Sequence, residues 1–281
     1  MARLFGLIGN RADLAGRVLA SEASALSVKA GVNLPLGWGI GFYQGGEVLM
    51  RRRPLDDRPE IDVAKNGADV RADVLIGHVR SATVGTLRTE NTHPFRYRQW
   101  LFAQTGTVVA FESIRDRLTA SVPEFLRGDI RGETDSEIVF HVFLSFLHDA
   151  GRLNEIVLEE AVVRDALRST VAVVDQMTAE VGGEPGSLNM MLANGDHIVS
   201  VHRGAPMAWR VFAGKNDADA LIGEDLQLRR KAPELAQMHF TLLASDFDSP
   251  LESEALRHWK PVDDRAIVTL TRGQEPKTEP L

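Results

Sequence analysis

The sequence predicts an α+β fold in which two largely antiparallel β-sheets pack together with helices outside them. Short apolar runs separated by Gly- and Asn-rich turns predict strands in the first and last parts of the 281 residues. Two long helical patterns lie between these groups of strands. No internal repeat or linker divides the chain, so we expect a single domain over residues 1–272. The Gly-, Pro-, Glu- and Lys-rich residues 273–281 predict a disordered tail.

The first part of the chain predicts mainly strands. Residues 4–9 form a short apolar run typical of a buried strand, and residues 14–27 have apolar side chains at helical spacing. Residues 37–43 and 47–51 flank a Gly-Gly turn, which predicts a hairpin. Residues 74–79 form the next apolar run and predict another strand.

Two short strands are expected next, over residues 100–103 and 107–111, with Gln104-Thr105-Gly106 as a turn between them. The clearest helix signal follows. Thr134 and Glu137 have the spacing of a capping box, and an apolar stripe continues from them. A second long helix is expected over residues 154–181.

The last part of the chain again predicts strands, which are expected over residues 188–193, 197–203, 208–212, 239–244 and 266–271. Asn194-Gly195, between the first two of these strands, is a strong signal for a tight hairpin turn.

Composition excludes several classes of partner. The formal net charge of −7 is unfavourable for nucleic acid or an anionic membrane. The basic run Arg51-Arg52-Arg53 is followed closely by acids, which predicts a solvated strand end and turn. No signal-peptide pattern and no apolar run of ~20 residues occurs, so we expect a cytoplasmic protein.

The cysteine and histidine content bears on catalysis and metal binding. The chain has no cysteine, which excludes disulfides, thiolate ligands and thiol catalysis. None of the eight histidines has the spacing of a metal motif, so we expect core or surface roles for them and no metal or cofactor.

Two charged residues stand out by position. Arg80 ends an apolar strand, where a cation normally requires a carboxylate partner. It can form a structural salt bridge, or its guanidinium can hold the carboxylate of a ligand. Asp135, in the first turn of the long helix, can simply stabilise the helix dipole.

Several motifs occur in one order along the chain: Met1-Ala2-Arg3-Leu4-Phe5-Gly6, Gly77-His78-Val79-Arg80, Asn91-Thr92-His93-Pro94, Phe102-Ala103-Gln104-Thr105-Gly106 and Gly132-Glu133-Thr134-Asp135-Ser136-Glu137. In content and order they resemble the class II glutamine amidotransferases. The resemblance implies an N-terminal nucleophile hydrolase fold, a four-layer αββα sandwich.

The resemblance also implies roles for individual residues. Arg80 would hold the α-carboxylate of glutamine with Thr83 close by, and Asp135 would hold the α-ammonium group. Gly106 would supply a backbone donor to the oxyanion hole. Thr105 stands where the family has an asparagine, and its shorter hydroxyl is a poorer donor for that site.

Ala2 occupies the position of the family's cysteine nucleophile, and a methyl group cannot attack an amide. We therefore expect a chain that binds glutamine or a γ-glutamyl ligand without hydrolysing it by the family route. Two alternatives stay open. Ala2 can be a deliberate replacement in an active amidotransferase or γ-glutamyl hydrolase. The chain can also be a docking or regulatory subunit for a synthase or another protein partner.

Overall fold

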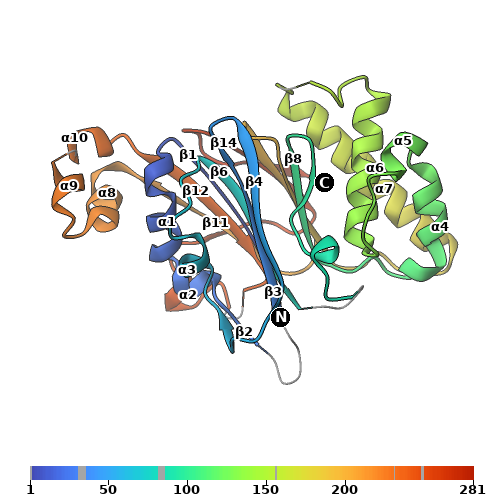
Figure 1. Ribbon diagram of the computed structural model, residues 1–281, viewed down its shortest axis with the longest axis horizontal. Helices are drawn as coiled ribbons and strands as arrows, with labels where there is room; N and C mark the ends of the chain where they lie inside the picture. Colours follow the sequence, from blue (N-terminus) through green and yellow to red (C-terminus); the bar gives the residue numbers. More distant parts are fainter. Residues whose placement is uncertain (1, 31–35, 82–85, 156, 231, 248–249) are drawn as a thin grey trace.

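Two antiparallel sheets packed face to face form the centre of the protein, with helices on both outer sides (Figure 1). The computed structural model describes residues 2–30, 36–81, 86–155, 157–230, 232–247 and 250–281. Within these ranges the first sheet has seven strands, in the order β13 (Lys260–Pro261), β11 (Met207–Ala213), β12 (His239–Ser245), β1 (Arg3–Gly9), β6 (Val74–Ser81), β3 (Leu36–Gln44) and β4 (Glu47–Asp56).

The second sheet has six strands in the described ranges and is also antiparallel. Its strands, in spatial order, are β15 (Lys277–Pro280), β14 (Ala266–Thr271), β10 (His197–His202), β9 (Leu188–Ala193), β8 (Trp100–Gly106) and β7 (Phe95–Tyr97). A separate small ladder joins β2 (Val28–Lys29) to β5 (Glu60–Ile61).

The helices form the two outer layers, which lie on opposite sides of the sheets in Figure 1. Beside the first sheet lie α1 (Ala15–Ser21), α2 (Ala23–Leu26), α3 (Val63–Gly67), α8 (Gly214–Ile222), α9 (Leu226–Arg229) and α10 (Ala232–Leu235). Beside the second sheet lie α4 (Phe111–Ser121), α5 (Glu124–Arg127), α6 (Asp135–Asp149) and α7 (Glu160–Glu180). Short 3-10 turns are η1 (Ala12–Leu14), η2 (Thr89–Asn91) and η3 (Glu254–Leu256).

Apolar side chains fill the three spaces between these four layers. On β1, Phe5 and Leu7 pack toward the helices, whereas Leu4 and Ile8 pack against the second sheet. This alternation is the normal period of a strand that is buried on both faces. The predicted α+β fold, an αββα sandwich, is confirmed.

The start of α6 has the Thr134 half of the predicted capping box, whereas the Glu137 carboxylate binds backbone N–H groups earlier in the loop. The Thr134 hydroxyl accepts a hydrogen bond from the backbone N–H of Glu137 at 3.3 Å. The Glu137 carboxylate accepts from the N–H groups of Arg131 and Gly132. Hydrogen bonds therefore connect the loop before α6 to the backbone and to the side chain of Glu137 in the first turn of the helix.

Other predicted elements differ from the structure. Gln104-Thr105-Gly106 continues β8 and is not a turn, and the strand expected over residues 107–111 is absent. The chain leaves β8 at Gly106 and enters α4 at Phe111, which buries Phe111, Ile114 and Leu118 at helical spacing. The helix expected from residue 154 begins at Glu160.

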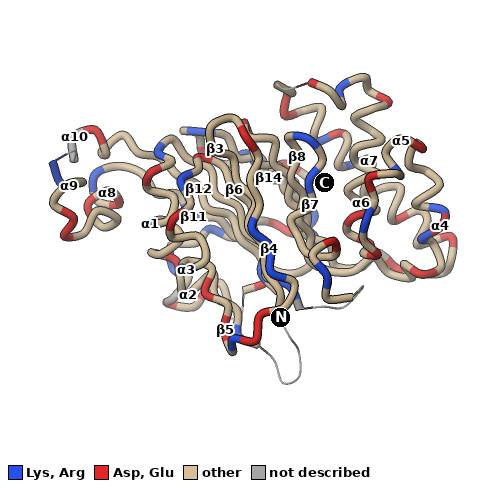
Figure 2. The backbone as a smooth tube through the Cα atoms, in the orientation of Figure 1, with Lys and Arg blue, Asp and Glu red and all other residues tan. Residues whose placement is uncertain are grey.

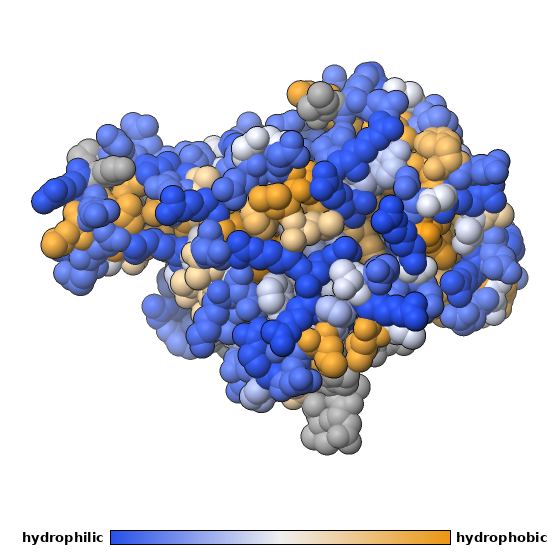
Figure 3. All heavy atoms as spheres, in the orientation of Figure 1, coloured by the Kyte–Doolittle hydropathy of each residue, from blue (hydrophilic) through white to orange (hydrophobic). Residues whose placement is uncertain are grey.

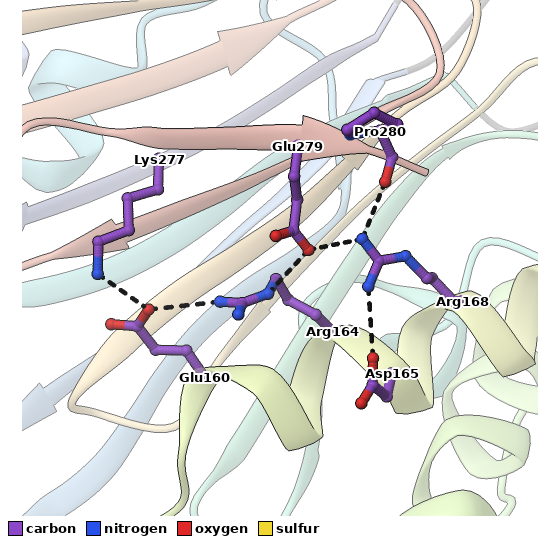
Figure 4. Close-up of polar contacts among 7 residues, drawn as sticks. All are labelled: Glu160, Arg164, Asp165, Arg168, Lys277, Glu279 and Pro280. Carbon is purple, nitrogen blue, oxygen red and sulfur yellow. Dashed lines mark hydrogen bonds and ion pairs between the residues drawn. The ribbon is translucent and has the colours of Figure 1, made fainter.

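The chain end also differs from the predicted disordered tail. Lys277–Pro280 forms β15, which pairs with β14. Glu279 of β15 makes ion pairs with Arg164 and Arg168 of α7, at 2.9 and 2.6 Å (Figure 4). These partners lie far away in sequence, so local composition does not reveal them. Among the described residues, no helix is both long enough and apolar enough to span a bilayer.

Candidate ligand-binding site

The alternation of side chains brings Ala2 and Arg80 to the same end of the sandwich. On β1, Leu4 faces the second sheet. Ala2, which directly precedes the strand and is half-buried, is two residues away and lies on the same inner face. The β1–β6 register pairs Arg3 with Val79, which places Arg80 opposite Ala2.

Arg80 is buried at the end of β6, with 5% of its surface exposed. Its Nη1 donates a hydrogen bond to the carbonyl of Asn91 at 2.7 Å. Burial lowers the pKa of the guanidinium, and the negative charge of Asp135 opposes this shift. The carboxylate that the sequence analysis required near Arg80 is therefore supplied by Asp135.

Asp135 is held at the start of α6 by backbone donors. Its Oδ2 accepts from the N–H of Val108 and its Oδ1 from the N–H of Ser136, each at 2.8 Å. Burial raises the pKa of the carboxyl, and these hydrogen bonds oppose the rise. Because Val108 follows Gly106 by two residues, the same contacts bring Asp135 next to the end of β8.

Thr105 lies on β8, which faces β1 and β6 across the sandwich. Its hydroxyl donates a hydrogen bond to Oδ2 of Asp246 at 2.7 Å. The hydroxyl of Ser245 donates to the same oxygen. Since a hydroxyl has one proton, Thr105 in this arrangement has no proton left for a ligand oxygen.

Gly106 ends β8 in a backbone conformation that favours glycine. Its φ is +90°, in the region that L side chains rarely adopt. A Cβ at this position would lie 2.0 Å from the carbonyl oxygen of Ser187. Both the backbone angle and the space therefore require glycine here.

Two histidines pack beside Arg80. The centroids of the His78 and His93 rings lie 4.4 Å apart. Gly39 allows the backbone of His93 to approach β3 closely, since a Cβ at Gly39 would lie 2.1 Å from the carbonyl oxygen of His93. Burial lowers the pKa of His78 to about 3, and burial also lowers the pKa of His93, helped by the positive charge of Arg80. Both rings are therefore neutral near neutral pH.

Gln104 is a polar residue in an apolar place. Its side chain is buried on β8, and neither its Oε1 nor its Nε2 has a hydrogen-bond partner among the described residues. Such groups are uncommon because a buried amide without partners costs free energy.

The structure gathers most of the predicted site residues at this end of the sandwich: Ala2, Arg80, Thr105, Gly106 and Asp135. Thr83 lies outside the described residues. His78, His93 and Asp246 also lie at this end of the sandwich, although the sequence did not predict them as site residues. The two histidines stand inside the quoted motifs, whereas Asp246 has no sequence signal and is brought in by the end of β12. Gln104 lies on the opposite face of β8, which it shares with Trp100 and Phe102, and is not part of the site.

The site can recognise charge. Arg80 and Asp135 offer opposite charges in a buried setting, which suits a molecule with a carboxylate beside an ammonium group. No cluster of three or more metal-binding side chains occurs among the residues that the structure describes.

Sequence comparison shows the family. The chain matches the glutamine amidotransferases class-II over residues 1–279. It is 27% identical over 207 residues to an Escherichia coli protein provisionally named a glutamine amidotransferase, covering 68% of this chain and 69% of that protein. It is also 32% identical over 116 residues to an uncharacterized protein of Methanocaldococcus jannaschii. That match covers 40% of this chain and 30% of the relative's length.

Solved structures share the fold. A predicted glutamine amidotransferase from Pseudomonas aeruginosa has a TM-score of 0.57 and 19% identity, with 97% of this chain and 98% of that chain covered. Glutamine phosphoribosylpyrophosphate amidotransferase of B. subtilis has a TM-score of 0.55 and 14% identity, with 99% of this chain but 49% of that chain covered. The match over residues 1–279 and this shared sandwich place the chain in the class-II glutamine amidotransferase family.

Proposed function

We propose that this chain binds the head group of an amino acid or γ-glutamyl compound between Arg80 and Asp135. The observation that carries the proposal is the position of these two residues. Both are buried, both lie at one end of the sandwich, and the charge of Asp135 acts on Arg80. A guanidinium suits a ligand carboxylate and a carboxylate suits an ammonium group.

The same site is expected not to hydrolyse glutamine through residue 2. Ala2 carries no nucleophilic atom, and loss of a nucleophile costs on the order of 10⁶ in rate in enzymes that depend on one. The hydrogen bond from Thr105 to Asp246 supports this proposal, because it occupies the hydroxyl that would otherwise serve the oxyanion hole.

Binding is tested by calorimetry with glutamine, glutamate and γ-glutamyl peptides. We expect heat of binding at millimolar ligand in the unaltered chain and at least a tenfold loss, roughly 1.4 kcal/mol, in Asp135→Asn. The introduced amide would keep one oxygen to accept from the N–H of Val108, but it would lose the charge and the oxygen that accepts from the N–H of Ser136. Asp69→Asn, which changes an exposed acid that pairs with Arg51, is the matched control. A folded protein that gives no heat with any of these ligands would contradict the proposal and favour a docking subunit.

Catalytic silence is tested by restoring the missing groups. The double change Ala2→Cys and Thr105→Asn should produce glutaminase activity, measured as ammonia release, if the rest of the site is intact. The single change Ala2→Cys should give much less, by about 10²-fold, because one oxyanion donor would still be missing. Full activity from Ala2→Cys alone would instead favour an active enzyme whose cysteine was replaced.

A further inference from the structure

A cavity of about 660 Å³, apart from the candidate site, opens between β4, β7 and the loop that leads into α6. β4 and β7 are the last strands of their sheets on this side of the sandwich. Arg96 of β7 donates to the carbonyl of Val48 on β4 at 3.0 Å, which joins the two edges. Figure 2 shows basic stretches of the chain on β4 and β7 lying side by side, with α6 beyond β7. Figure 3 shows the molecular surface that these strands form in the same orientation. None of the described candidate site residues lines this cavity.

Four arginines line the cavity: Arg52, Arg96, Arg98 and Arg131. Their hydrogen bonds go to neutral groups, including the carbonyls of Thr92 and Val48. None of the four makes an ion pair with a described residue. Arginines elsewhere on the surface, such as Arg51 and Arg117, do pair with carboxylates.

Three consecutive arginines on β4, Arg51, Arg52 and Arg53, point alternately to the two faces of the strand. Arg51 pairs with Asp69 and Arg53 with Asp56. Alternation turns Arg52 to the opposite side, where it is half-buried and lines the cavity. The prediction that the whole run is a solvated strand end is therefore wrong for Arg52. Burial lowers the pKa of Arg52, and the negative charges of Glu90 and Glu137, which line the same cavity, oppose this shift.

The cavity also has acceptors. The carboxylates of Glu90, Asp129 and Glu137 line it, although backbone N–H groups already bind that of Glu137. His141, on the same wall, is 3% exposed, and its Nε2 has no hydrogen-bond partner among the described residues. Its Nδ1 lies 2.8 Å from the carbonyl of Glu137, so the proton belongs on Nδ1 and Nε2 is an acceptor. The arginines of the cavity can therefore donate hydrogen bonds to an anionic group of a ligand, and the carboxylates and His141 can accept hydrogen bonds from its hydroxyl or amino groups.

We infer that this cavity binds a small organic anion that carries a carboxylate or phosphate group together with hydroxyl or amino groups. The arginines hold the anionic group, since their planar forks match both carboxylate and phosphate. This second site is distinct from the one between Arg80 and Asp135. The segment that carries Asn91 and Thr92 separates them, because Arg80 donates to the first carbonyl and Arg52 to the second.

The test is calorimetry with inorganic phosphate, citrate and glycerol 3-phosphate at constant ionic strength. Citrate or glycerol 3-phosphate should bind more tightly than inorganic phosphate, because each adds a hydroxyl. Arg131→Gln should weaken that binding at least about tenfold, the loss expected for one charge-assisted contact. Arg131 makes no side-chain hydrogen bond with a described residue, so the variant should fold. Arg127→Gln, which changes an exposed arginine of α5 outside the cavity, is the matched control and should bind within about twofold of the unaltered chain.

A second pair of variants uses the arginine run on β4. Arg52→Gln should weaken binding, whereas the double change Arg51→Gln and Arg53→Gln should not, although it removes more charge from the same strand. Asp135→Asn should leave the binding of these anions unchanged, so failure of the amino-acid site and failure of this site are distinguishable. No binding of any probe at concentrations on the order of 10 mM would overturn the inference, as would equal loss in Arg131→Gln and Arg127→Gln.

Discussion

The side chain of Thr105 determines whether the segment Gln104-Thr105-Gly106 can donate a side-chain hydrogen bond to a ligand oxygen. Its hydroxyl donates to Asp246, which lies 141 residues further along the chain. An asparagine at this position would have two N–H donors, and one could remain available while the other was engaged. The residue type at position 105 suggests a weak donor, and its contact with Asp246 gives the physical reason to expect no donor at all.

Arg80 shows the same dependence on context. Its position after an apolar strand predicts a need for negative charge, and Asp135 provides it. Its guanidinium also donates directly to the Asn91 carbonyl. A carbonyl neutralises no charge, so this hydrogen bond orients Arg80 and leaves its electrostatic attraction for a ligand carboxylate in place.

The contact between His78 and His93 predicts a pH dependence of stability. The pKa of each ring is lower in the folded protein than the ordinary value of 6.5, so the unfolded chain binds more protons as the pH falls. For His78 the free energy of unfolding should therefore decrease from about pH 6.5 down to about pH 3, by on the order of 1 kcal/mol per pH unit, and His93 should add a decrease in the same direction. His78→Gln should remove its share of this slope, which urea denaturation between about pH 7 and pH 4 would measure. The exposed His148→Gln serves as the control, and an unchanged slope in His78→Gln would contradict the prediction.

At the scale of elements, the start of α6 combines a helix cap with the candidate site. Thr134 caps the helix, and Asp135 is the next residue. The loop before the helix is held by a hydrogen bond from the N–H of Gly132 to the Glu137 carboxylate. Asn91 adds a further link, since its Oδ1 accepts from the N–H of Glu133. The cap therefore fixes both the helix end and the segment that separates the two sites.

Removal of the cap should destabilise the protein. Thr134→Ala should lower the free energy of unfolding by about 1 kcal/mol, because the N–H of Glu137 loses its partner. Thr134→Ser keeps a hydroxyl and should lie close to the unaltered protein. Guanidinium denaturation gives the stability of each. Equal stability of the alanine and serine variants would show that the hydroxyl does not stabilise the helix.

The sheet edges illustrate a second consequence of element arrangement. β4 and β7 end their sheets on the same side, and their arginines meet in one cavity although Phe95, the start of β7, lies 43 positions after Arg52 in the chain. The run Arg51-Arg52-Arg53 in the sequence does not by itself predict that Arg52 lines a cavity together with arginines from another sheet. The alternation of side chains along β4 places Arg52 on one face and Arg51 and Arg53 on the other. The arginines that join Arg52 around the cavity include Arg96 of β7, which belongs to the other sheet.

At the scale of the whole molecule, the chain end completes the second sheet. β15 pairs with β14, and Leu281 packs against the core beneath α7. The ion pairs of Arg164, Arg168 and Lys277 in Figure 4 fasten β15 to α7, but these side chains are partly exposed. Such pairs are typically worth less than about 1 kcal/mol each.

Deletion of residues 277–281 should therefore cost more than removal of the ion pairs. Glu279→Gln is expected to lower the free energy of unfolding by less than about 1 kcal/mol. The deletion also removes the strand hydrogen bonds and the apolar contact of Leu281, and it should cost at least about 2 kcal/mol. Thermal and urea denaturation would compare the two variants. An unchanged stability after the deletion would indicate that β15 contributes nothing to the folded state.

Local features of the sequence predict most strands, the capped helix and the residues that carry charge at the candidate site. Strand alternation, turn residues and capping are local properties, and the order of the motifs pointed to Arg80, Asp135 and the position of Ala2. The end of β8 was predicted too early because Gly106 is a residue type common in turns, whereas here its positive φ ends a continuous strand. The helix α4 was not predicted, and a strand was expected where it begins.

The contacts between side chains that are distant in sequence follow from the tertiary structure alone. It joined Thr105 to Asp246, paired His78 with His93, gave the chain end a strand partner and gathered four arginines around one cavity. Each of these contacts depends on register between strands or on packing between layers. These are set by the burial of apolar surface over the whole chain, and so a short window of sequence does not contain them.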